Sequence, residues 1–164
     1  MSQESEIKVN NYHLDHVINK VVFNGDTITS EKYSTGRHLS FYISENMVGY
    51  CSESLGWHIL NSFRILWIKD TLKFYNDNAF YTYFQTDELN DSIDVDKLVI
   101  SKWRRDKEVG IDSLKSIYSF LIIRKDDNNI VLEPIDPIYK FTMLDTTSIY
   151  FNRKKFKQEF HFSK

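Results

Sequence analysis

The feature that most restricts the fold of this chain is a two-residue alternation of apolar and polar side chains, repeated in short segments that end in turn-forming clusters. Residues 63–85, with the sequence FRILWIKDTLKFYNDNAFYTYFQ, contain three such segments, separated by KDT and by NDN. Successive side chains of a β-strand point to opposite faces of a sheet, and Asp and Asn favour turns. Residues 63–85 therefore predict three consecutive antiparallel strands.

Two hairpins are predicted from short turn motifs. Asn24 and Gly25 lie between two β-prone runs, and this dipeptide supplies the positive φ angles of a tight two-residue turn. Residues 116–135, SIYSFLIIRKDDNNIVLEPI, predict a second hairpin, with its turn at Asp126–Asn129 and a strand end at Pro134.

The periodicity of the remaining segments is less uniform. Residues 10–20 predict a short amphipathic helix, because apolar side chains recur there at helical spacing: Leu14, Val17 and Ile18. Residues 38–44 alternate and predict a half-buried strand whose inner face carries Leu39, Phe41 and Ile43. Residues 44–62 fit either a helix capped by Ser52 or strands, and both interpretations stay open.

Strands are also predicted near the C-terminus. Residues 138–144 place Tyr139, Phe141 and Met143 on one side of an extended segment, and residues 148–152 and 155–162 are rich in rings. The basic residues of this region are more typical of a protected edge strand than of a site for single-stranded nucleic acid: Arg153, Lys154, Lys155 and Lys157.

The predicted fold is mainly β, of the α+β class. We expect an antiparallel meander of about eight to ten strands that curls into an open or closed barrel, with one or two short helices. The aromatic content agrees, since 12 Phe, 10 Tyr and 3 Trp make up 15% of the chain and rings pack well on a pleated surface. Residues 1–164 are expected to form a single domain, with residues 1–9 as a flexible or loosely attached N-terminal segment.

The charge distribution narrows the choice of partner. Residues 1–100 carry 8 Lys and Arg against 14 Asp and Glu, whereas residues 101–164 carry 13 against 9. Such a dipolar pattern suits steering toward a charged protein and disfavours duplex nucleic acid, which usually requires a strongly basic domain.

The chain is expected not to bind or cross a membrane, because its longest apolar run, residues 120–123, is far shorter than the roughly 20 residues of a spanning helix. A single cysteine, Cys51, and an N-terminus unlike a secretory signal predict a cytoplasmic location.

An acidic loop beside an aromatic segment is the candidate partner-binding site. Residues 80–97, FYTYFQTDELNDSIDVDK, begin as an alternating strand and then hold five carboxylates. Exposed tyrosines supply contact area and a hydroxyl group, while carboxylates speed the approach of a basic partner. The candidate partner-binding residues are Tyr81, Tyr83, Asp87, Glu88, Asp91, Asp94 and Asp96. The alternative, that this loop is merely solvated, stays open.

Motifs for metal or catalytic chemistry are weak. His13 and His16 lie three residues apart on the predicted helix, but zinc needs further ligands that the sequence does not place nearby. Cys51 precedes His58 by seven residues, which does not establish the contact that an activated thiol needs, and a lone cysteine is usually a small buried apolar residue. We therefore expect no metal, no cofactor and no enzymatic activity.

Three classes of function are compatible with these observations. The first is a small protein-binding module that blocks a protein partner with a basic surface, such as a bacterial immunity protein or an antitoxin against a basic toxin. The second is a lipocalin-like barrel that binds a small apolar ligand. The third is an enzyme with dispersed active-site residues around Cys51 and His58.

Overall fold

The computed structural model describes residues 9–34, 37–44, 47–55, 58–76, 116–144, 147 and 155–164. These residues form nine strands and a short 3₁₀ helix, η3. The elements are β1 (Val9–Phe23), β2 (Asp26–Tyr33), β3 (Arg37–Ser44), β4 (Val48–Leu55), β5 (His58–Ile68), β6 (Thr71–Asn76), β7 (Ser116–Lys125), β8 (Asn129–Pro134), η3 (Tyr139–Phe141) and β9 (Phe156–Ser163). No helix among them is long and apolar enough to cross a membrane.

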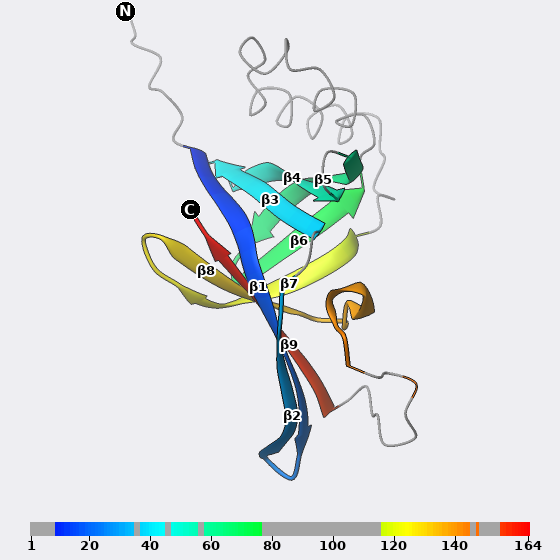
Figure 1. The fold of residues 1–164 in the computed structure, drawn as a ribbon. Helices are drawn as coiled ribbons and strands as arrows, with labels where there is room; N and C mark the ends of the chain where they lie inside the picture. The colour runs from blue at the N-terminus through cyan, green and yellow to red at the C-terminus, as the bar shows by residue number, and fades with distance from the viewer. Residues whose placement is uncertain are drawn as a thin grey trace, which may run out of the picture.

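The strands form a closed antiparallel barrel of eight strands with one additional strand, β2 (Figure 1). Each strand from β3 to β9 pairs with the next one along the chain, and β9 pairs with β1 to close the barrel. The prediction of an antiparallel, mainly β fold that curls into a barrel is confirmed.

Strand β1 is long enough to pair with three other strands. Its first part, Val9–His13, pairs with β3, and its second part, Val17–Phe23, pairs with β2 on the same edge. The opposite edge of β1 pairs with β9 along His13–Val21. The second half of β1, β2 and the start of β9 therefore form an arm, and Figure 1 shows the β1–β2 hairpin extending away from the barrel.

The barrel interior is filled largely by rings. Inward-facing rings contact one another both across the barrel and between paired strands: the ring centroids are 4.9 Å apart for Phe41 of β3 and Phe162 of β9, and 5.1 Å apart for Phe74 of β6 and Phe120 of β7. Offset and edge-to-face ring pairs of this kind add to the hydrophobic stabilisation of burial. The rest of the core is aliphatic, including Val17, Leu39, Ile65, Leu72, Ile130 and Leu132.

The tight turns that the sequence predicts are present. Asn24 and Gly25 adopt φ angles of 51° and 83°, as a two-residue hairpin turn requires. The β7–β8 turn is held by Asp126, whose Oδ1 accepts hydrogen bonds from the backbone N–H groups of Asn128 and Asn129. These two hydrogen bonds lower the pKa of Asp126.

The helix predicted for residues 10–20 is wrong, because this segment is the central part of strand β1. The register of β1 against β9 shifts between Leu14 and His16, so one extra residue is inserted there. This bulge turns both Leu14 and Val17 toward the core, and their spacing of three imitates a helical face. The segment left open, residues 44–62, contributes strands β4 and β5, and Ser52 lies within β4.

The strand predicted for residues 138–144 is also wrong. The segment forms η3, in which Phe141 is 1% exposed while Met143 beyond it is 77% exposed. Strand β9 confirms the strand predicted at residues 155–162. It pairs with β1 along residues 156–163 but with β8 along residues 160–163 only, so at Lys157 one side of β9 has no partner among the described strands. The predictions for residues 80–85 and 148–152, and most of those for residues 1–9, lie outside the described residues.

Candidate functional site

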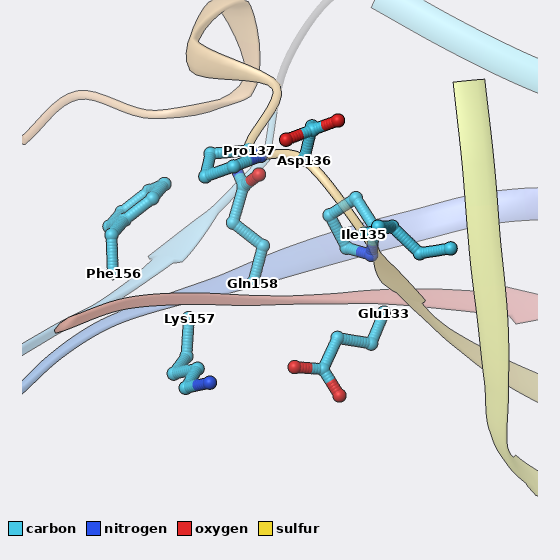
Figure 2. A pocket seen from close by; sticks show the side chains of 8 residues that line it. Glu133, Ile135, Asp136, Pro137, Phe156, Lys157 and Gln158 are labelled. Carbon is cyan, nitrogen blue, oxygen red and sulfur yellow. The ribbon is translucent and has the colours of Figure 1, made fainter. Parts of the chain in front are cut away.

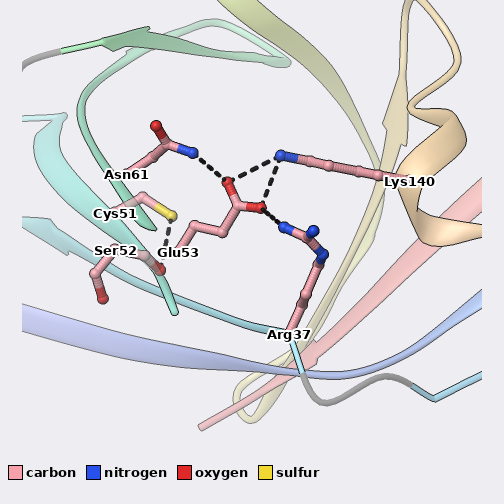
Figure 3. A network of polar contacts seen from close by, with 6 residues as sticks. All are labelled: Arg37, Cys51, Ser52, Glu53, Asn61 and Lys140. Carbon is pink, nitrogen blue, oxygen red and sulfur yellow. Dashed lines mark hydrogen bonds and ion pairs between the residues drawn. The ribbon is translucent and has the colours of Figure 1, made fainter. Parts of the chain in front are cut away.

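A buried carboxylate lies inside one end of the barrel. Glu53 is 0% exposed, and its two oxygens bind three side chains (Figure 3). Lys140 Nζ lies 2.7 Å from Oε1 and 2.9 Å from Oε2 of Glu53, and Arg37 Nη1 lies 3.2 Å from Oε1. Asn61 Nδ2 donates to Oε2 at 3.1 Å. Burial of the carboxylate is therefore compensated by two cations and an amide.

These groups come from elements far apart in the sequence. Glu53 faces inward because it alternates along β4 with Cys51, which is fully buried. Asn61 is the direct partner of Glu53 on β5, and Arg37 begins β3 on the other side. Lys140 belongs to η3, which follows β8, so the Glu53 ion pair fixes this segment to the barrel wall.

Electrostatics at this end favour a charged lysine and a neutral thiol. Burial opposes the charged form of Lys140, but hydrogen bonds and charges from Glu53 and Tyr118 outweigh it, so the pKa of Lys140 lies above its usual value. Burial, together with the nearby Glu53 carboxylate, raises the pKa of the Cys51 thiol. Thiolate chemistry at Cys51 is therefore disfavoured at neutral pH.

A second polar network holds the backbone of the segment around η3. Gln158 accepts a hydrogen bond from the Ile138 N–H at 2.7 Å and donates one to the Ile138 carbonyl at 3.1 Å. Asn19 donates to the Phe141 carbonyl at 2.8 Å. Ile138 and Phe141 also pack into the core. We call residues 138–142 the plug, because these contacts hold the segment against this end of the barrel.

Two open hollows flank the plug. One, of about 430 Å³, lies between the plug and β9, and Figure 2 shows Gln158 reaching toward Pro137 while Lys157 points from the other side of β9. The other, of about 440 Å³, lies between the plug and β7 and is lined by Ile117, Tyr118, Ser119, Ile135, Asp136, Pro137, Ile138, Tyr139 and Lys140. Both volumes fall within the range of small-ligand sites.

The outer face of β7 carries exposed aliphatic side chains. We call these residues the outer aliphatic row: Ile117, Leu121, Ile123 and Ile135, which are 48%, 41%, 47% and 56% exposed. The first three belong to β7, and Ile135 is held beside that strand because its N–H donates to the Ser119 carbonyl at 2.9 Å. The inward-facing Phe120, which is 1% exposed, fixes the opposite face of the strand in the core.

The partner-binding residues predicted from the sequence lie outside the described residues: Tyr81, Tyr83, Asp87, Glu88, Asp91, Asp94 and Asp96. Their role therefore stays a prediction. The outer aliphatic row was not predicted, although the alternation of SIYSFLIIRK contains the signal, because apolar residues occupy both faces of that strand.

The candidate metal and thiol residues are separated by the fold. His13 Nδ1 lies 2.8 Å from Ser40 Oγ, whereas the ring of His16 stacks on that of His161 with centroids 4.5 Å apart. Within the described part of the chain, no group of three or more His, Cys, Asp or Glu residues is arranged to hold a metal ion. Cys51 pairs with Phe63, whereas His58 pairs with Leu55 beside the turn of the β4–β5 hairpin. Cys51 and His58 are therefore not cross-strand partners.

The Glu53 cluster was also missed by sequence reasoning. A carboxylate at an inward position of an alternating strand is its signal, but that signal is legible only once residues 48–55 are known to be a strand. Lys140 gives no local signal, because its contact with Glu53 spans 87 residues.

Comparisons with protein families, with curated proteins and with solved structures found no match to this chain. The functional argument therefore depends on the geometry above.

Proposed function

We propose that this chain is a protein-binding module that blocks a protein partner, and that the partner docks on the outer aliphatic row. The observation that carries the proposal is the run of exposed aliphatic side chains along β7, continued by Ile135. Contiguous exposed apolar surface on a folded domain usually marks an interaction site, whereas isolated exposed apolar residues need no explanation.

The surroundings of the row fit a protein interface. Leu121 lies between Thr71 of β6 and Glu133 of β8, and Ser119 lies beside Lys73. An apolar centre bordered by polar and charged side chains is the usual anatomy of a protein–protein interface. The paired strands fix the backbone of the row, so little backbone entropy is lost when a partner binds.

The interior of the barrel supports the same choice. Rings from β3, β6, β7 and β9 contact one another across the described core, with Phe41, Phe74, Phe120 and Phe162 each 2% exposed or less. In the part of the barrel that these residues occupy, side chains fill the space that a lipocalin-like barrel gives to its ligand.

The acidic segment adds a second element to the proposal. Asp87, Glu88, Asp91, Asp94 and Asp96 give residues 87–96 a strongly negative charge, which attracts a partner with a basic surface. An immunity protein or antitoxin that neutralises a basic toxin acts in this way, with the toxin as its partner, and a cytoplasmic location suits such a protein. Tyr81 and Tyr83 would then add aromatic contacts at the same partner.

The experiment is affinity capture from the native host, followed by mass spectrometry of the captured proteins. We expect a specific partner with wild-type bait and its loss with Leu121→Lys, because a charge at the centre of the row cannot be desolvated without a counter-ion. The control is Leu55→Lys, which adds the same charge at a 45% exposed leucine at the end of β4. Equal capture by both variants would remove the row from the interface.

A second candidate function is favoured by the hollow of about 440 Å³ beside Tyr118 and Lys140. Its lining is mixed, because Ile117, Ile135 and Ile138 lie beside Tyr118, Asp136 and Lys140, so this hollow suits a small ligand with both apolar and polar groups. Native mass spectrometry of the purified chain distinguishes the two: a retained small molecule, with no captured protein, would favour the ligand barrel.

A further inference from the structure

The arm formed by β1 and β2 ends in a bare strand edge. Among the strands that the structure describes, β2 alone pairs on one side only, with β1. Residues 24–30 are all exposed, so the hairpin tip is open on both faces as well as along this edge. Unpaired backbone N–H and C=O groups on an exposed strand are a template for another strand, and proteins usually protect them.

The unpaired edge of β2 has few of the features that usually prevent a strand from pairing with another chain. Strand β2 has eight residues, DTITSEKY, with no proline and with Lys32 as its one basic residue. A bulge lies opposite Val21 and Val22, which disturbs the strand near the turn but leaves Thr29–Tyr33 in regular register with β1. That regular portion is long enough for a neighbouring strand to add hydrogen bonds.

We propose that β2 pairs with β2 of a second copy of this chain, antiparallel about a two-fold axis at Ser30. This inference concerns a different surface from the outer aliphatic row and does not depend on it. Of the described strands, β2 alone is unpaired along the whole of one side, so the fullest free edge that a second copy offers is again β2. Pairing of two identical edges covers both and closes the assembly as a dimer.

The side chains of β2 fit an axis at this position. An axis at Ser30 sets Ser30 against its own copy, Thr29 against Glu31 of the second copy, and Ile28 against Lys32 of the second copy. Hydroxyl pairs are favourable across strands. The Glu31 carboxylate keeps its hydrogen bonds to Asn19, Thr142 and the Met143 N–H within its own chain. An axis at Glu31 would instead place two carboxylates directly opposite, which is destabilising.

The test is the mass of the full chain in solution, measured by sedimentation across a wide range of concentration. We expect wild-type protein to approach twice the mass of one chain as concentration rises. Ser30→Lys should stay at the mass of one chain at every concentration, because two lysines would face each other at the axis. Asn128→Lys, the control, adds the same charge at an exposed turn residue away from the arm and should associate as wild type does.

A cross-link checks the register independently of any effect on folding. Directly opposed residues of antiparallel strands have Cβ atoms about 4.5–5.5 Å apart, close to disulfide range. Under mild oxidation, Ser30→Cys should give a covalent dimer and Asn128→Cys should not, while the native Cys51 is buried and does not compete. A wild-type chain that remains monomeric, a Ser30→Lys variant that still dimerises, or equal cross-linking at both positions would overturn the proposal.

Discussion

Glu53 shows how a single charged residue organises one end of this barrel. A carboxylate that is 0% exposed is strongly unfavourable unless it is paired, and here Lys140, Arg37 and Asn61 supply the partners. Lys140 connects this pairing to the plug, so the charge of Glu53 contributes to holding a separate segment in place.

The first prediction concerns this ion pair. Lys140→Met should destabilise the fold by about 2 kcal/mol or more, because it leaves a buried carboxylate with fewer partners. Adding Glu53→Gln to Lys140→Met should recover part of the loss, since the remaining side chain is then neutral. Urea unfolding of the single and double variants measures this coupling. Lys157→Met, at an exposed lysine on β9, is the control, and additive effects of the two substitutions would contradict the ion-pair account.

At the scale of elements, the contact between β1 and β9 closes the barrel. His16 and His161 are direct cross-strand partners on this seam, and their rings stack with an interplanar angle of 13°. Burial lowers the pKa of His16 below its ordinary value of 6.5, and the neighbouring His161 and Lys32 lower it further, while Asp15 acts in the opposite direction. Glu159 contacts His161 at 3.2 Å from the same face.

The seam should therefore weaken in mild acid. A histidine with a lowered pKa binds protons more weakly in the folded than in the unfolded chain, so stability falls as the pH drops below about 6.5 and levels off below the folded pKa. Replacing His16 with Phe keeps a ring on the seam and should flatten the pH dependence of the unfolding free energy between neutral and mildly acidic pH. His13→Gln, on the same strand, should keep the wild-type dependence. An unchanged slope in His16→Phe would show that the pair does not carry this effect.

The elements also show which parts of the fold are legible in the sequence. The Asn24-Gly25 turn was predicted because its signal is local and its φ angles are special. The helix predicted over residues 10–20 failed because a bulge at Leu14–His16 gives a strand the apolar spacing of a helix. The strand predicted over residues 138–144 failed because alternation shows nothing about whether a neighbouring strand is present, and this segment packs as a plug.

At the scale of the whole molecule, closure of the barrel depends on contacts that no local pattern encodes. Val17 pairs with Phe160, and Glu53 binds Lys140, so strand order and the buried site both emerge from residues distant in sequence. The sequence therefore indicated a barrel without showing that it closes, and it indicated no inward-facing ion pair. The outer aliphatic row was hidden for a related reason, because a strand that is apolar on both faces is usually buried on both.

The central claim of this account is that the barrel presents its outer aliphatic row to a protein partner. The most direct measurement is the dissociation constant of the captured partner for wild type, Leu121→Ala, Ile123→Ala and the control Leu55→Ala. All three substituted side chains are exposed, at 41%, 47% and 45%, so folding stability should change little. The account predicts that at least one of the two β7 variants loses about 2 kcal/mol of binding free energy, with the control unchanged. Wild-type affinity in both β7 variants would contradict it.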